Sequence, residues 1–179
     1  EKLARDSVLD VPADSSMRVF TMPDPTGISG AHFVDLRLTG ADGHPISTNF
    51  YWLSTRMDVL SDSSTWYMTP VRNYADFTSL RSMPQAAVNA TARFTSSGGT
   101  GHARVTLRNP GRSIAFFMRL QVTGRDGEEA LPVLWEDNYL SLLPGETRVV
   151  TANYRVRDLG GAPPRLVVTG WNVRRTVVR

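Results

Sequence analysis

Two pairs of adjacent carboxylates are the side chains in this sequence that come closest to a catalytic arrangement: Glu128-Glu129 and Glu136-Asp137. Hydrolysis of a glycoside by two carboxyl groups needs them to face each other across the substrate, about 5–10 Å apart. Neighbouring residues on a strand point to opposite faces of the sheet. These pairs do not meet the requirement, so the sequence predicts no catalytic residue.

Metal, thiol and phosphate chemistry are also not indicated. The three histidines are dispersed and show no metal-ligand spacing: His32, His44 and His102. The chain has no cysteine, which excludes a thiolate zinc site, a thiol nucleophile and a disulfide scaffold. Gly27–Gly30 does not have the pattern of a nucleophile elbow, and Ser96–Gly101 lacks the lysine of a phosphate-binding loop. The sequence predicts neither a metal nor a cofactor.

Aromatic side chains are the one feature that could bind a ligand, because flat rings stack on sugar rings while polar edges remain free to hydrogen-bond. Trp66, Tyr67 and Tyr74 lie in an irregular stretch rich in Ser, Asp and Met. We consider these three residues candidates for sugar stacking. The alternative is that they pack in a core or against a neighbouring domain, and the sequence favours neither.

Four other aromatic residues are better candidates for packing between domains: Tyr51, Trp52, Trp135 and Tyr139. Trp52, Trp135 and Trp171 lie in strand-like contexts, where a large ring usually covers a core or an adjoining domain. Packing is therefore the favoured interpretation for these residues.

Charge is divided unevenly along the chain, whose formal net charge is +3. Residues 1–84 carry seven basic and ten acidic side chains, whereas residues 85–179 carry thirteen basic and seven acidic ones. A basic half is compatible with nucleic-acid binding. Its arginines, however, alternate with apolar residues, as on the solvated face of a sheet: Arg104, Arg108, Arg119, Arg155 and Arg157. We expect no nucleic-acid partner, and no apolar run approaches the ~18 residues that a membrane span needs.

Strict alternation of apolar and polar residues predicts an all-β fold. Three runs show it, with their apolar members on one face: Ala103, Val105 and Leu107; Phe116, Met118, Leu120 and Val122; Val150, Ala152, Tyr154 and Val156. Leu166–Trp171 begins another run. Turn sequences rich in Gly, Pro and Asn separate the runs, and short strands at about 8–12-residue spacing favour a β-sandwich.

An internal repeat indicates two related modules. Ala31–Gly43 aligns with Ala115–Gly127, with seven of thirteen positions identical, and each stretch is predicted to be a strand that enters an Asp-Gly turn. A chance match of two similar hairpins is the alternative. We place the modules at residues 1–84 and 85–179.

The second module can supply about seven strands, enough for a complete sandwich. The first supplies only about four, near residues 6–11, 16–22, 31–39 and 45–54, followed by an ordered connector over 55–84. Since so few strands bury little and leave open edges, we expect its first strands to precede Glu1 in a longer parent chain. Any signal peptide would also lie upstream.

Three strings resemble the C-terminal part of glycoside hydrolase family 2 enzymes, in the branch of exo-β-D-glucosaminidases and β-mannosidase-like members. They are Asn49–Ser54 (NFYWLS), Tyr74–Leu80 (YADFTSL) leading to Pro84, and Asp137–Glu146 (DNYLSLLPGE). The last string is the most specific, and together they cover nearly the whole chain.

The resemblance implies tandem immunoglobulin-like sandwiches that follow a catalytic barrel, the first sandwich being incomplete in this chain. It implies a non-catalytic accessory region that packs against the barrel and other domains and shapes one wall of the substrate cleft. It also implies a secreted parent enzyme that releases terminal β-linked sugars, most simply glucosamine from chitosan oligosaccharides. The family's catalytic glutamates lie in the barrel, and no position here matches their motifs.

Two other functions stay open at this point. An independent carbohydrate-binding module would present exposed aromatic rings, including Trp66 and Tyr67, to an oligosaccharide. A fibronectin-like adhesion or scaffold module would have no sugar affinity and a self-sufficient first module, which the few strands of residues 1–54 argue against.

Overall fold

The computed structural model describes residues 7–22, 27–63 and 65–179. The chain divides into two compact units, Glu1–Ser82 and Met83–Arg179, each of which is described by itself. Nearly all regular structure is β, as the alternation predicts, and the helical segments are two short 3-10 turns.

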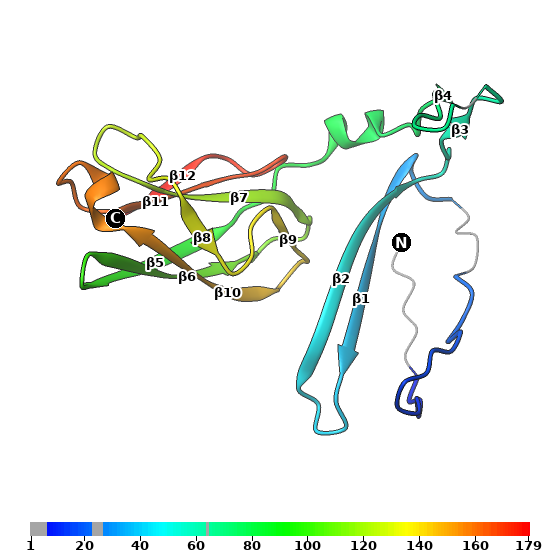
Figure 1. Cartoon of the computed structure of the whole chain (residues 1–179), viewed down its shortest axis with the longest axis horizontal. Helices are drawn as coiled ribbons and strands as arrows, with labels where there is room; N and C mark the ends of the chain where they lie inside the picture. Colours follow the sequence, from blue (N-terminus) through cyan, green and yellow to red (C-terminus); the bar gives the residue numbers. More distant parts are fainter. Residues whose placement is uncertain (1–6, 23–26, 64) are drawn as a thin grey trace. The chain divides into compact units, whose positions relative to one another are not determined.

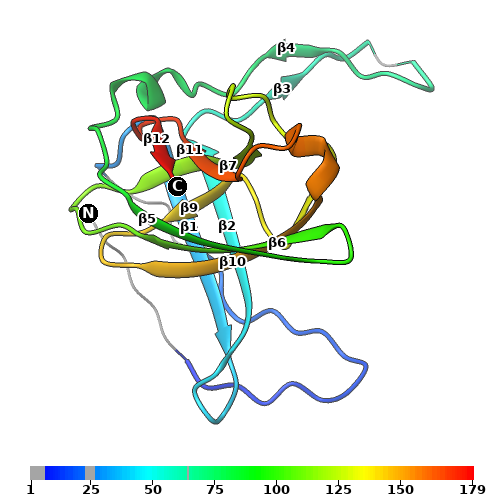
Figure 2. The ribbon, with the colours of Figure 1, turned by 90° about the vertical axis from the view of Figure 1, so that its left-hand side faces the viewer.

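The second unit is a sandwich of two four-stranded antiparallel sheets (Figure 1). The first sheet has the order β5-β6-β10-β8, with the bounds Asn89–Ser97, Thr100–Arg108, Thr147–Arg155 and Val133–Trp135. The second has the order β12-β11-β7-β9, with the bounds Thr176–Val178, Arg165–Thr169, Ala115–Thr123 and Leu140–Leu142. Figure 2 shows the β5-β6-β10 layer below the β7-β11-β12 layer.

The core of this unit lies between its two sheets. The alternating residues Val105 and Leu107 of β6 are fully buried, and they share one cluster with Leu120 of β7 and Val168 of β11. A second cluster of buried residues in the same sandwich surrounds Tyr154 of β10. The predicted alternation is therefore that of half-buried strands, whose apolar side chains face the core and whose polar side chains face solvent.

Strands β5 and β6 are joined by the predicted hairpin loop. Gly98 and Gly99 both have positive φ, 57° and 83°, so the loop is a two-residue turn of the type that matches the twist of paired strands. Two residues later, Gly101 lies opposite Tyr154 of β10, and the buried Tyr154 ring covers it. Burial raises the pKa of the Tyr154 hydroxyl.

Strand β7 contains a bulge that the sequence did not predict. Ala115 pairs with Leu142 and Met118 pairs with Leu140, so the ladder to β9 is interrupted between them, and Phe117 has a φ of 51°. The extra residue changes the parity of the strand, because a one-residue shift exchanges its faces. Ala115 therefore occupies the core cluster in place of Phe116, which corrects one position of the predicted apolar face.

Two further residues lie outside their predicted strands. Strand β10 ends at Arg155, and Val156 begins the 3-10 helix η2 (Val156–Leu159), whose end at Gly160 is left-handed. Strand β11 ends at Thr169, and Trp171 lies in the following loop, where its N–H donates to the carbonyl oxygen of Phe116. In both places the chain turns before the apolar run has ended.

Asn172 fastens the start of the second unit to its end. Its Oδ1 accepts from the N–H of Phe116 (2.9 Å), and its Nδ2 donates to the carbonyl oxygens of Pro84 and Ile114 (both 2.8 Å). Its own carbonyl accepts from the N–H of Ala86. Asn172 is almost fully buried, so these bonds satisfy a polar group that water does not reach.

Two other asparagines replace missing backbone partners. Asn109 is fully buried and donates from Nδ2 to the carbonyl oxygens of Ser113 and Leu142. Asn138, between β8 and β9, accepts from the N–H of Leu120 and donates to its carbonyl, as a neighbouring strand would. These side chains hold the segments where the chain passes from one sheet to the other.

In the first unit, β1 (Ala31–Thr39) and β2 (Pro45–Ser54) form a long antiparallel hairpin, as predicted (Figure 1). Apolar side chains lie on both faces of it. Val34, Leu36 and Leu38 share one face with Tyr51 and Leu53, whereas Phe33, Phe50 and Trp52 share the other. A strand pair with two apolar faces is typical of a sheet that is covered on both sides.

The two strands predicted before the hairpin are absent. Residues 7–22 form no strand, and their side chains are exposed; residue 6 lies outside the described residues. Apolar residues alone do not make a strand, since a strand needs a partner for its backbone hydrogen bonds. No described strand pairs with this segment.

The predicted connector contains a two-stranded ladder of β3 (Val59–Leu60) and β4 (Val71–Asn73), followed by the 3-10 helix η1 (Thr78–Ser82). Hydrogen bonds attach it to the hairpin. The Ser54 hydroxyl donates to the carbonyl oxygen of Asp76 and accepts from its N–H. Two of the strings that carry the family resemblance, NFYWLS and YADFTSL, therefore meet at this point.

The repeated strand-turn element is present in both units. Gly43 and Gly127 have φ values of 78° and 81°, and their N–H groups donate to the carbonyls of Gly40 and Gly124. Positive φ at these positions is why glycine is needed there. The prediction of two similar Asp-Gly turns is confirmed.

Asp76 gives a pH-dependent prediction. Its Oδ1 accepts from the hydroxyl (2.6 Å) and the N–H (2.9 Å) of Thr78 at the start of η1, and these bonds lower the pKa of the carboxyl, the hydroxyl contributing most. A lowered pKa means that this stabilisation is present above the ordinary value and is lost as the pH falls through the lowered one. Thr78→Val should raise the Asp76 pKa back toward its ordinary value, measured by an NMR pH titration. An unchanged pKa in Thr78→Val would show that the hydroxyl is not the cause.

Candidate functional site

The tip of the β3-β4 loop carries Trp66, the most exposed aromatic residue that the structure describes, next to the exposed Tyr67. The N–H of Thr65 donates to the carbonyl of Met68 (2.8 Å), and this closes a turn with Trp66 and Tyr67 at its centre. The two rings pack edge to face, with centroids 5.1 Å apart. Trp66 is 96% exposed and Tyr67 is 69% exposed, so both rings are presented to solvent. We call this pair the aromatic tip.

The loop below the aromatic tip is held by polar contacts. The N–H of Ser61 donates to the carbonyl of Pro70, and Arg72 Nη2 forms an ion pair with Asp62 Oδ2 at 3.0 Å. These residues were not singled out from the sequence; the Ser- and Asp-rich composition of the loop was the only signal. They orient the tip, so they are positioning residues for whatever the rings contact.

Tyr74 is not brought to the aromatic tip. It is 77% exposed, but it follows β4, whose last residue, Asn73, pairs with Val59 at the base of the ladder. The tip lies at the opposite end of that ladder. The structure thus unites two of the three sugar-stacking candidates and leaves the third apart.

Tyr51 and Trp52 lie on opposite faces of the β1-β2 hairpin. Tyr51 is paired with Val34, and Trp52 is paired with Phe33. Since adjacent residues of a strand point in opposite directions, one layer of protein cannot cover both rings. Any packing role must involve two different surfaces.

The other two packing candidates belong to the second unit. Trp135 of β8 is half-buried and packs against both core clusters of its own sandwich. Tyr139 is half-exposed, has a φ of 55°, and lies against Phe117 with ring centroids 5.3 Å apart. Phe117 and Tyr139 both have a left-handed backbone conformation, and their rings lie in contact at the surface of the bulge.

Three of the four carboxylates considered for catalysis form contacts within the sandwich. Glu129 accepts from Arg119 and Gln121, and Glu136 accepts from the N–H and hydroxyl of Thr151. Asp137 pairs with Arg148. These groups hold neighbouring segments together, and none is paired with another carboxylate.

The histidines are likewise separate. His102 Nδ1 is bonded to Asn153 Oδ1 (2.7 Å), and His44 lies against Asp42. The buried Nδ1 of His32, on the hairpin, has no hydrogen-bond partner. Over residues 7–22, 27–63 and 65–179, no group of three or more His, Asp or Glu side chains is placed to hold a metal ion. Among the residues that the structure describes, no helix has the length and apolarity that crossing a membrane requires.

Chemically, then, the aromatic tip can bind but not react. The two exposed rings, packed edge to face, could offer a face and an edge to a sugar ring, and an indole face attracts cations. The neighbouring hydroxyl-rich loop supplies hydrogen-bonding groups.

Comparison with known proteins gives one family. The family model described as the exo-beta-D-glucosaminidase Ig-fold domain matches residues 66–173. The exo-beta-D-glucosaminidase of Amycolatopsis orientalis is 42% identical over 85% of this chain, and that of Streptomyces avermitilis is 41% identical over 88%. The crystal structure of the A. orientalis exo-chitosanase CsxA superposes on 89% of the chain with a TM-score of 0.83 and 40% identity.

The chain spans only a small part of each of these proteins. It covers 15% and 18% of the two curated relatives and 19% of the crystallised CsxA chain. The match begins at residue 66, inside the aromatic tip, and ends at Val173, so it includes η1 and almost all of the second unit.

Proposed function

Because the chain belongs to the Ig-fold domain family of exo-β-D-glucosaminidases, we propose that it serves as the non-catalytic accessory region of a glycoside hydrolase with that activity. The observation that carries the proposal is the family match over residues 66–173, in a chain that covers less than a fifth of its relatives. The family resemblance, the immunoglobulin-like fold and the accessory role that were expected from the sequence agree with this match. The activity of the parent remains part of the proposal.

The parent protein would hydrolyse terminal β-linked glucosamine, with chitosan oligosaccharides as the substrate class. In support, relatives over 40% identical carry the name exo-beta-D-glucosaminidase, and the matching crystal structure is that of an exo-chitosanase. The family resemblance implies a secreted enzyme, and we propose an extracellular location for the parent protein on that basis.

The partners of this region would be the catalytic barrel and other domains of the same parent chain. The two apolar faces of the β1-β2 hairpin support this, because they leave Tyr51 and Trp52 each half-exposed on a different side. Burial of such surface stabilises by about 25 cal/mol per Å². Each face would cover a different neighbouring surface of the parent.

A second function, direct contact with the oligosaccharide, is favoured by the aromatic tip. Glucosamine units are cationic, and cations bind over the face of tryptophan better than over other rings. Residues 1–84, which include the tip, carry more acidic than basic side chains, whereas residues 85–179 carry an excess of basic ones. A cationic sugar chain would therefore approach through the first half of the chain.

Titration of the 179-residue chain with glucosamine oligosaccharides tests this contact. We expect no turnover of a chromogenic β-D-glucosaminide and weak binding in a calorimeter. Trp66→Ala should weaken that binding about three- to tenfold, the loss of one ring contact.

Tyr74→Ala is the matched control, since Tyr74 is also exposed but lies apart from the tip. It should bind as the unchanged chain does. Absence of binding to the unchanged chain would overturn the sugar contact and leave the accessory role. Turnover by the isolated chain would overturn the non-catalytic assignment itself.

A further inference from the structure

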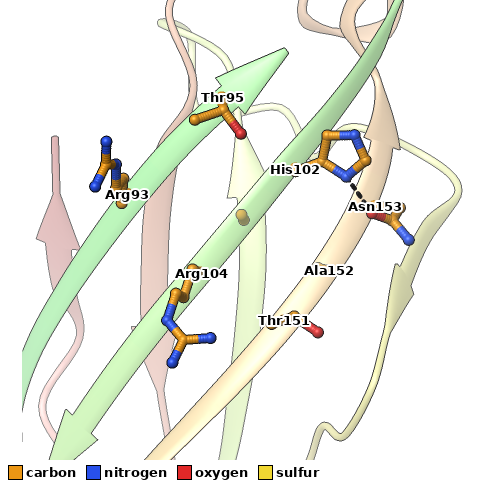
Figure 3. A pocket seen from close by; sticks show the side chains of 8 residues that line it. Arg93, Thr95, His102, Arg104, Thr151, Ala152 and Asn153 are labelled. Carbon is orange, nitrogen blue, oxygen red and sulfur yellow. Dashed lines mark hydrogen bonds between the residues drawn. The ribbon is translucent and has the colours of Figure 1, made fainter. Parts of the chain in front are cut away.

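The outer face of the β5-β6-β10 sheet carries an open depression of about 460 Å³ (Figure 3). The side chains that reach into it come from three neighbouring strands: Arg93, Thr95, His102, Arg104, Thr151 and Asn153. We call this set the outer depression. All of these residues alternate with core-facing ones, so they lie on the side of the sheet opposite the hydrophobic core.

Two arginines lie opposite each other in the strand register at this depression. Arg93 of β5 pairs with Arg104 of β6, and Arg104 in turn pairs with Thr151 of β10, so the three form one row across the sheet. Like charges directly opposite each other on adjacent strands are destabilising. Figure 3 shows the two guanidinium groups turned away from one another, as expected for facing like charges.

No carboxylate compensates these charges. Other arginines of the second unit, Arg119, Arg148 and Arg155, each have an acidic partner, but no ion pair joins Arg93 or Arg104 to any described residue. Glu136 is the acidic residue nearest in the row, and both hydrogen bonds from Thr151 are already directed at it. The depression therefore has two positive charges whose attraction for an anion is not used within the sandwich.

The second row of the depression supplies neutral hydrogen-bonding groups. Thr95, His102 and Asn153 form a parallel row across the same three strands. This row lies two residues along each strand from the row that contains the arginines. His102 Nδ1 donates to Asn153 Oδ1, and this contact leaves the Asn153 amide N–H groups free to donate outward (Figure 3). No Phe, Tyr or Trp ring lines the depression, so it lacks the broad stacking surface that a neutral sugar prefers.

From this arrangement we propose that the outer depression is a binding site for an oxyanion, a phosphate or sulfate group toward which the exposed side chains of Arg93 and Arg104 turn on binding. A guanidinium group matches the oxygen spacing of such an anion and bonds to it through two N–H groups. A doubly charged anion would neutralise both arginines and relieve their repulsion, while Thr95, on the same strand and face as Arg93, offers its hydroxyl to a remaining oxygen. The same group could arrive as the free ion or as an ester on a sugar.

This site is distinct from the aromatic tip. It lies in the second unit, it is basic where a glucosamine chain is cationic, and its recognition rests on guanidinium groups instead of rings. Failure of the proposed function would leave it untouched, because the site is argued only from residues of β5, β6 and β10.

Amide NMR of the 179-residue chain, titrated with sodium phosphate at constant ionic strength, tests the proposal. We expect saturable shifts at Thr95, His102, Arg104 and Asn153, with a dissociation constant of about 1 mM. Arg104→Gln should weaken binding about tenfold or more, since one charged set of hydrogen bonds is lost. Without phosphate, Arg104→Gln should melt no lower than the unchanged chain, which shows that the variant is folded.

Arg112→Gln is the matched control: it removes the same charge from an exposed arginine in the β6-β7 loop, and it should bind phosphate as the unchanged chain does. Glucose 6-phosphate distinguishes the sources, because tighter binding than phosphate favours the ester and equal binding favours the free ion. Shifts that never saturate, or an equal loss in Arg112→Gln, would overturn the site. Shifts of the same residues by glucosamine would overturn it as well.

Discussion

Asn172→Asp should lower the free energy of unfolding of the second unit by about 4 kcal/mol. The substitution keeps the shape of the side chain and the bond from the N–H of Phe116, but it removes both Nδ2 donors. The carbonyls of Pro84 and Ile114 then face a carboxyl group in a site that water does not reach. Stranded carbonyls and a buried charge each contribute to the loss.

The effect of Asn172→Asp should depend on pH. Burial against carbonyl oxygens raises the pKa of the introduced carboxyl above its unfolded value of about 3.9. A folded-state pKa above the unfolded one means that stability falls as the pH rises past the unfolded value. Urea unfolding followed by circular dichroism should therefore show a larger loss at pH 7 than at pH 4.5.

Asn153→Asp is the control, because Asn153 is exposed and its Oδ1 already accepts from His102. Its free energy of unfolding should change by less than about 0.5 kcal/mol. A loss below about 1 kcal/mol for Asn172→Asp would mean that the bonds of Asn172 are replaced by water or by a shift of the backbone.

Gly101→Ala should cost about 3 kcal/mol, through a different mechanism. A Cβ atom at this position would lie within the space of the Tyr154 ring, closer than real Cβ contacts come. That ring is buried and packs edge to face on Phe94, with centroids 6.5 Å apart, so it cannot swing into solvent without opening the second core cluster.

A double-mutant cycle with Tyr154→Ala isolates this clash. Once the ring is removed, Gly101→Ala should cost at least 1 kcal/mol less, a coupling of about the size expected for residues in contact. Gly30→Ala is the control, since its Cβ would meet only the Ser79 hydroxyl at 3.8 Å. Equal costs of Gly101→Ala with and without the ring would place the strain in the backbone instead.

The regular part of the fold could be predicted from the sequence because it follows from alternation and turn residues. The hairpin of β1 and β2 begins and ends where its pattern does, and Gly43 and Gly127 take the turn conformation that glycine permits. The family resemblance, carried by strings such as DNYLSLLPGE, is confirmed by the match over residues 66–173.

The irregular part could not be predicted, because it depends on partners remote in sequence. Nothing in the run around Phe117 marks the bulge that moves Ala115 into the core; no glycine or proline stands there. Residues 16–22 have a sequence pattern suitable for a strand, but no described strand pairs with them. Asn138 and Asn172 read as ordinary loop residues, and only the fold reveals the backbone groups that they satisfy.

The candidate sites show the same division. Exposure of Trp66 and Tyr67 follows from an irregular, polar stretch, and the sequence pointed to them. Tyr74 was grouped with them by proximity in the chain, yet the β3-β4 ladder separates it from the tip. The sequence predicted Arg104 to lie on the solvated face of a sheet, but it could not show that Arg93 lies opposite it, since that is a property of strand register.

The hydrogen bonds of Asn172 also constrain when this domain can complete its folding during synthesis on the ribosome. Its side chain binds Pro84, 88 residues earlier, and its carbonyl binds Ala86. The first residues of the domain emerge early in synthesis but can be fastened only after nearly the whole domain has left the exit tunnel. Contacts of such long range form late, since the intervening chain must first be ordered. During translation, the first segment of the domain therefore stays unbound until the loop that contains Asn172 has been synthesised and has left the tunnel.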